Sequence, residues 1–166
     1  MFLLFFMSNN VFASHNDDPI FEDTTLSKEE INAYLTGVSL DLDKVADIYH
    51  FPNPKRVLEL KGLLRLTRAQ KNRTVMSYQL MRKYTIRAGR DIVRKESRLN
   101  QLFQQSDFDL EVVEKLVNEI AVLKGKLRFA HLKARVKQKG YLGSDQLTVY
   151  FQNNTRQNSA VYAFDE

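Results

Sequence analysis

The chain has 166 residues, with 25 Lys and Arg against 20 Asp and Glu, and it has no cysteine. This length fits one domain, and the lack of thiols excludes a disulfide-stapled fold and a cysteine nucleophile. Six glycines and three prolines are too few for a many-turned β-sandwich, so the composition favours helices.

The first 13 residues resemble an export signal. Met1–Met7 is apolar, and Val11 and Ala13 stand where a signal peptidase reads small or branched residues. Cleavage after Ala13 would leave Ser14 as the mature N-terminus outside the cytoplasm, and the missing positive n-region implies a start upstream of Met1. A frayed hydrophobic N-terminus is the alternative. No stretch reaches the roughly 20 apolar residues of a transmembrane helix, so no membrane span is expected.

Charge is strongly segregated along the chain. Residues 14–50 contain nine acids and two bases, a net charge of −7, whereas residues 51–98 contain 14 bases and three acids, a net charge of +11. Two arrangements fit this pattern. Either the acidic segment folds back over the basic one, or the basic surface binds an anionic or acidic partner.

The N-terminal part predicts short helices after a polar start. Residues 14–25 are acidic and are expected to form a flexible leader. Ser27 with Glu30 makes a capping box, which predicts a helix to about residue 35, before Gly37. A second helical turn is expected at 43–49, and the prolines at 52 and 54 predict an elbow followed by a short amphipathic helix.

A second capping box, Thr67 with Gln70, starts the dominant predicted helix, residues 68–105. At 1.5 Å per residue this helix would be about 57 Å long and would need a partner helix to cover it. Its predicted apolar stripe is Ala69, Met76, Leu80, Tyr84, Ala88, Ile92, Leu99, Leu102 and Phe103.

The partner helix follows a reversal at 106–109. Its apolar residues recur at spacings of 3 and 4, at Val113, Leu116, Ile120, Leu123, Leu127, Ala130 and Ala134. The two segments predict an all-α fold built on a long antiparallel helical hairpin with short flanking helices. A further helix is expected at 144–151, within a helical domain at 26–152, and the tail at 153–166 is expected to be flexible.

The residues offer little for catalysis, and we expect a protein that is not an enzyme. His15, His50 and His131 lie in the leader, the elbow and the second long helix, without a second ligand at zinc-binding spacing. His15 with Asp17 and Asp18 makes at best a weak metal site. No Gly-rich phosphate loop is present. We therefore expect no metal and no cofactor.

The basic surface of the dominant helix is the candidate binding site. It contains Arg82, Lys83, Arg87, Arg90, Arg94, Lys95 and Arg98, of which all but Lys95 are our candidate client- or partner-binding residues. Three interpretations fit: a solvated helix face, a track for a phosphate backbone, or a cationic cradle for segments of other proteins. The pI near 9.4 favours the second, but no known nucleic-acid module is present and export would separate the protein from nucleic acid.

Two five-residue motifs resemble the LTxxQ motif of the periplasmic Spy and CpxP family of chaperones and stress sensors. The first is Leu66-Thr67-Arg68-Ala69-Gln70, and the second is Leu142-Gly143-Ser144-Asp145-Gln146, in which glycine replaces threonine. Upstream segments are similar to a front extension of relatives described as periplasmic heavy-metal sensors, so the resemblance covers roughly residues 26–152. In this interpretation Leu66, Thr67, Gln70, Leu142 and Gln146 have a structural role at the base of the hairpin.

The resemblance implies a Spy/CpxP-like fold and ATP-independent binding of unfolded or misfolded periplasmic proteins, often as a homodimer. The alternative is a periplasmic regulator, with or without metal, that binds the sensor domain of an envelope-stress kinase. A nucleic-acid-binding helical protein is the second alternative. Histidines or cysteines that hold zinc in sensor relatives are not evident here.

Overall fold

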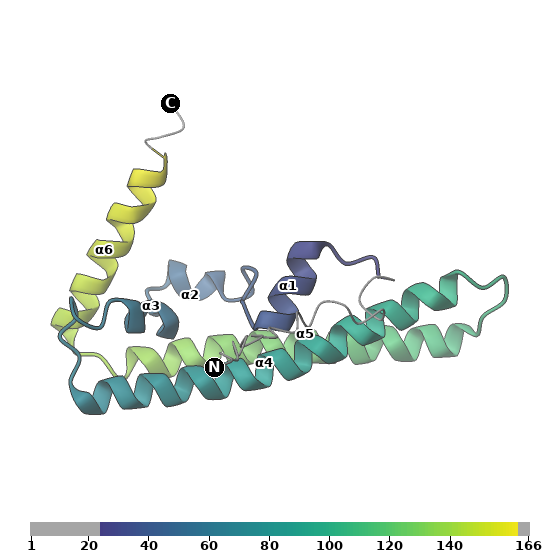
Figure 1. Ribbon diagram of the computed structural model, residues 1–166, viewed down its shortest axis with the longest axis horizontal. Coiled ribbons are helices and arrows are strands. Elements are labelled where there is room, and N and C mark those ends of the chain that lie inside the picture. The colour runs from purple at the N-terminus through teal and green to yellow at the C-terminus, as the bar shows by residue number, and fades with distance from the viewer. Residues whose placement is uncertain (1–23, 163–166) are drawn as a thin grey trace, which may run out of the picture.

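The computed structural model describes residues 24–162, with side chains as far as Asn154 (Figure 1). The predicted signal at 1–13, most of the leader and residues 163–166 lie outside this range. Within the described range, six helices follow one another: α1 (Lys28–Thr36), α2 (Lys44–Ile48), α3 (Pro54–Glu59), α4 (Arg68–Phe103), α5 (Leu110–Lys139) and α6 (Ser144–Tyr162).

The long antiparallel hairpin predicted from the sequence is present as α4 and α5. α4 has 36 residues and α5 has 30, so they are about 54 Å and 45 Å long. The Thr67–Gln70 capping box at the start of α4 is formed in both directions. At the other end, the rings of Phe103 and Phe108 pack 4.8 Å apart, and Asp109 caps α5 through the backbone N–H of Glu111.

The short helices α1, α2 and α3 lie along one side of the hairpin, whereas α6 rises away from its base (Figure 1). α1 starts at the predicted Ser27–Glu30 capping box and ends at Gly37, whose left-handed backbone (φ 74°) suits glycine. Pro54 occupies the first turn of α3 as expected, because its missing N–H is not needed there.

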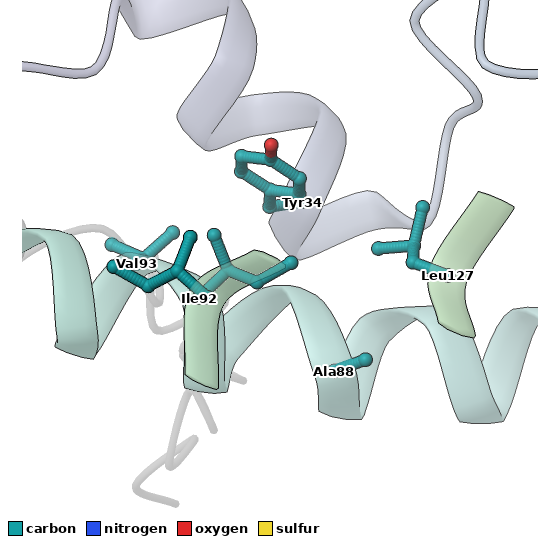
Figure 2. Close-up of a cluster of buried hydrophobic side chains, with 6 residues drawn as sticks. Tyr34, Ala88, Ile92, Val93 and Leu127 are labelled. Atoms are coloured by element: carbon teal, nitrogen blue, oxygen red, sulfur yellow. The ribbon is translucent and has the colours of Figure 1, made fainter. Parts of the chain in front are cut away.

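α1 packs closely onto the middle of α4, and glycine makes this approach possible. A Cβ on Gly89 would lie only 2.8 Å from the Cα of Tyr34. Tyr34 joins Ile92, Val93 and Leu127 in the central hydrophobic cluster (Figure 2). This cluster therefore connects α1, α4 and α5 at one point.

A second hydrophobic cluster closes the base of the hairpin. Val57, Leu64, Leu142 and Tyr150 are its buried members, drawn from α3, the segment before α4, the turn between α5 and α6, and α6 itself. The Tyr150 hydroxyl accepts a hydrogen bond of 2.9 Å from the backbone N–H of Asn53. α3 and α6 are therefore held together although they are far apart in sequence.

The predicted seam of α5 is confirmed, because all seven residues of its stripe are buried or half-buried. The stripe predicted for α4 is wrong in part: Met76 and Leu80 are 70% and 69% exposed, and Ala69, Tyr84 and Phe103 are also exposed. The reason is that α4 contacts α1 and α3 as well as α5. Small residues fill the closest contacts instead, and those buried on α4 are Thr74, Thr85, Ala88, Gly89 and Ser97.

α6 extends further than the sequence indicated. A helix ending near Phe151 was predicted, but the helix continues to Tyr162, through most of the segment expected to be a flexible tail. The continuation was not predicted because this segment is rich in Asn and Gln, and its apolar residues do not recur at helical spacing.

Candidate functional site

Most of the predicted basic residues form one row on the outer surface of α4. Lys83, Arg87, Arg90 and Arg94 are all exposed and are spaced by 4, 3 and 4 residues, which places them on one helix face. Arg98 is exposed one turn further on. We call these five residues the basic row.

Arg82 does not belong to the basic row. Its Nε donates a 3.2 Å hydrogen bond to the carbonyl of Thr36, so it holds the last turn of α1. Lys95 also turns away and pairs with Glu119 of α5. Arg94 pairs with Asp91 on its own helix. Within the part of the chain that the structure describes, the other four members of the basic row form no ion pair.

An apolar groove lies beside the basic row, between α4 and α5. Its volume is about 380 Å³, and Leu80, Met81 and Tyr84 line it from α4. The residues that line it from α5 are Lys126, Phe129, Ala130, Lys133, Ala134 and Lys137. No carboxylate lines it, so the groove is apolar at its floor and cationic at its rim.

The groove and the basic row form a continuous surface. Tyr84 lies three residues from Arg87 and one from Lys83, and residues three or four apart are neighbours on a helix. Leu80 and Phe129, on opposite walls, are 69% and 64% exposed. An extended chain lying in the groove would therefore meet apolar side chains below and cations on both sides.

This surface lies on the opposite side of α5 from the short helices. Arg135 of α5 contacts the segment around α2, whereas Lys126 and Lys133 project about 160° to 180° away from Arg135 on the same helix. The short helices consequently leave the groove open.

The sequence interpretation found the basic row but missed the groove, because it assigned Leu80 and Tyr84 to the core. A signal for the groove was present in α5. Lys126, Phe129, Lys133 and Lys137 recur at helical spacing beside the apolar seam, as a stripe of mixed cationic and apolar character. Such a stripe borders a binding surface more readily than a solvated face.

A buried ion network fixes the chain around α2 onto α5. The Nε atom of Arg135 lies 2.6 Å from Oδ2 of Asp43, and both side chains are more than 90% buried. The same guanidinium binds Asp47 and the carbonyl of Phe51, and Ser39 donates to Asp43. Burial by itself raises the pKa of Asp43, but the hydrogen bonds from Arg135 and Ser39 outweigh it and hold this pKa below its usual value.

His131 lies next to this network and is 4% exposed, one helical turn before Arg135. Burial lowers its pKa, Arg135 adds to this effect, and the charge of Asp43 opposes it. Among the described residues, no hydrogen-bond partner faces its Nε2 atom or the buried side-chain amide of Gln138. Both residues lie within about 60° of Arg135 around α5, on the side away from the lysines that line the groove.

The motif residues gather at the base of the hairpin. Gln70 and Gln146 face each other, and each donates its amide N–H to the other's oxygen, at 2.8 Å and 3.1 Å. Each oxygen also accepts a backbone N–H at the start of its own helix, from Thr67 and from Gly143. Leu142 is buried in the base cluster, and Leu66 packs against it.

Within residues 24–162, no group of three or more His, Asp or Glu side chains is placed to hold a metal ion. His15, Asp17 and Asp18 lie outside this range. None of the helices in the same range is long and apolar enough to cross a bilayer. Comparisons with family models, curated proteins and solved structures found no match for this chain.

Proposed function

We propose that this protein binds unfolded segments of other proteins, without ATP and without catalysis, in the groove between α4 and α5. The observation that carries this proposal is an exposed, mainly apolar groove whose charged lining residues are all lysines. Unfolded chains expose the apolar side chains that a folded protein buries, and burying them in the groove removes apolar surface from water. The lysines and arginines attract acidic flanks without requiring a particular sequence.

The groove is suited to weak and varied binding. Its walls are the outer faces of two long helices, so an extended segment can lie along it in several registers. Met81 lines it, and methionine adapts to ligands of different shape because its side chain is flexible and polarizable. These properties favour many clients over one ligand.

We also propose that the protein works in the periplasm. The support is the apolar start of the sequence with Val11 and Ala13, together with the two motifs that resemble the LTxxQ family. Binding partners would then be unfolded or misfolded periplasmic proteins, and a homodimer would place two grooves in one particle.

The proposal is tested by dilution of a chemically denatured protein into buffer that lacks ATP, with aggregation followed by light scattering. We expect the wild type to suppress aggregation at a few-fold excess. The paired substitution Leu80→Ser with Phe129→Ser should raise the amount required about tenfold, because it removes the apolar walls of the groove.

The matched control is Val38→Ser with Ile48→Ser. These residues are similarly exposed, at 56% and 62%, but lie on the segment around α1 and α2. This variant should suppress aggregation like the wild type, and circular dichroism should show both variants folded. Equal loss in both pairs, or no suppression by the wild type, would contradict the proposal.

A regulatory role has support of its own. Val38, Leu40, Ile48 and Tyr49 form a second set of exposed apolar residues around α2, separate from the groove. Several exposed apolar side chains on one short stretch of chain suit contact with one folded partner, such as the sensor domain of a kinase. The Val38→Ser, Ile48→Ser variant tests this role. If it no longer captures a single partner that the wild type captures, but still suppresses aggregation, these exposed residues have the regulatory role.

A further inference from the structure

The basic row is a surface of like charges that the described residues do not neutralise. Lys83, Arg87, Arg90 and Arg98 have no ion-pair partner among residues 24–154, and only Arg94 pairs, with Asp91. Four unpaired cations along about four turns of one helix repel one another and attract a flexible anionic segment.

The described chain begins at the same level of α4 as this row, but on another face of the helix. Leu26 packs against the central cluster that contains Ile92 and Val93 of α4. Arg90 and Arg94 flank these two residues on the same turns of the helix. The residues before Thr24 therefore enter the fold at the middle of α4, one helix diameter, about 10 to 12 Å, from the basic row.

The ten residues 14–23 have the composition that the row requires. They read Ser-His-Asn-Asp-Asp-Pro-Ile-Phe-Glu-Asp, with four carboxylates, no lysine or arginine, and one apolar pair, Ile20 and Phe21. Ten residues reach at most about 33 to 36 Å, which is enough to pass around one helix. Cleavage after Ala13 would make this segment the N-terminus of the mature protein.

We propose that residues 14–23 are an intramolecular ligand of the basic row. Asp17, Asp18, Glu22 and Asp23 pair with the cations, and Ile20 with Phe21 enter the neighbouring groove at Tyr84. Because the segment is tethered, its effective concentration at the row is in the millimolar range. It therefore competes with any acidic chain that binds there, which makes it a built-in inhibitor of the binding surface. Only this last step rests on the proposed function.

The experiment measures binding of a fluorescent synthetic peptide with the sequence of residues 14–23, by anisotropy at low salt. The full-length protein is compared with a leader-neutral variant that contains Asp17→Asn, Asp18→Asn, Glu22→Gln and Asp23→Asn. We expect the leader-neutral variant to bind the peptide about tenfold more tightly, because its own leader no longer occupies the row. Equal affinity for both proteins, or no binding to either, would overturn the inference.

Two further variants, made in the leader-neutral background, locate the site. Arg87→Glu, Arg90→Glu and Arg94→Glu together should abolish peptide binding. Lys55→Glu, Lys61→Glu and Lys71→Glu change the net charge equally at three exposed residues near the hairpin base, and should reduce binding no more than about twofold. Equal loss in both would show only attraction to net positive charge and would overturn the proposed site.

The same proteins separate this inference from the proposed function. The aggregation assay does not enter the peptide measurement, so row-dependent peptide binding without aggregation suppression would support the inference and reject the function. Suppression of aggregation without peptide binding would support the proposed function and reject the inference.

Discussion

At the scale of single residues, the interaction of Arg135 with two aspartates shows how burial decides how much an ion pair contributes to stability. Both aspartates contact the same guanidinium, but the side chain of Asp43 is 7% exposed and that of Asp47 is 60% exposed. Breaking a buried pair leaves an uncompensated charge in the interior, whereas an exposed partner is largely replaced by water.

We therefore predict different costs for two chemically identical changes. Asp43→Ala should lower the free energy of unfolding by about 3 to 5 kcal/mol. Asp47→Ala should lower it by about 1 kcal/mol or less. Urea unfolding followed by circular dichroism measures both values. Similar costs would show that Asp43 and Asp47 are equally solvated, against the burial seen here.

His131 predicts a pH dependence near neutrality. The pKa of this buried imidazole is lowered from its ordinary value of 6.5, so the unfolded chain binds a proton at a higher pH than the folded protein does. The contribution of His131 to the free energy of unfolding is therefore fully present above about pH 6.5 and decreases as the pH drops below that value. Asp43, whose pKa is lowered, keeps its contribution until the pH falls below its unfolded value of 3.8.

Wild-type protein should accordingly unfold at lower urea concentration at about pH 5.5 than at about pH 7.5. His131→Gln should remove most of this difference, whatever its effect on stability at a single pH. Asp43 and Arg135 are the charged neighbours that act on this imidazole, and neither titrates in that window. A full pH dependence in the variant would assign it to other groups.

At the scale of elements, helix starts were the most predictable feature. Ser27 and Thr67 begin α1 and α4 as the capping boxes indicated, because these contacts are local in sequence. Contacts between helices were less predictable. Arg135 meets Asp43 across 92 positions, and nothing near either residue distinguishes it from a surface charge.

The docking of α1 onto α4 gives a prediction for two glycines. Gly89→Ala would place a methyl group against the backbone of Tyr34, and should cost about 1 to 3 kcal/mol through overpacking. Gly125→Ala, in the middle of α5, meets nothing within 4 Å and should stabilise by about 0.5 to 1 kcal/mol, because alanine favours helices.

Thermal unfolding of both variants checks this prediction. Since both changes add the same methyl group inside a long helix, helix propensity is matched and the opposite signs report the contact with α1 alone. A stabilised Gly89→Ala protein would mean that α1 is not held against α4 at this position.

At the scale of the whole molecule, the segregation of charge was visible in the sequence but its arrangement was not. Asp43 and Asp47 of the acidic segment fold onto α5, where they bind Arg135, and not onto the strongly basic stretch 51–98. Among the described residues, the acidic side chains therefore leave the basic row largely unneutralised. The groove beside it was hidden because α4 contacts helices on two sides, which rotates Leu80 and Tyr84 outward from the predicted seam.

The facing amides of Gln70 and Gln146 have a consequence for how this sequence can vary. Besides binding each other, Gln70 donates to the carbonyl of Tyr141 and Gln146 to that of Leu64, so the starts of α4 and α6 share one symmetrical junction. Replacing either amide alone removes four hydrogen bonds at once, two of them to the partner glutamine and two to backbone groups. The two glutamine positions, 76 residues apart, should therefore change only together. In homologous chains we expect both glutamines to be replaced or neither.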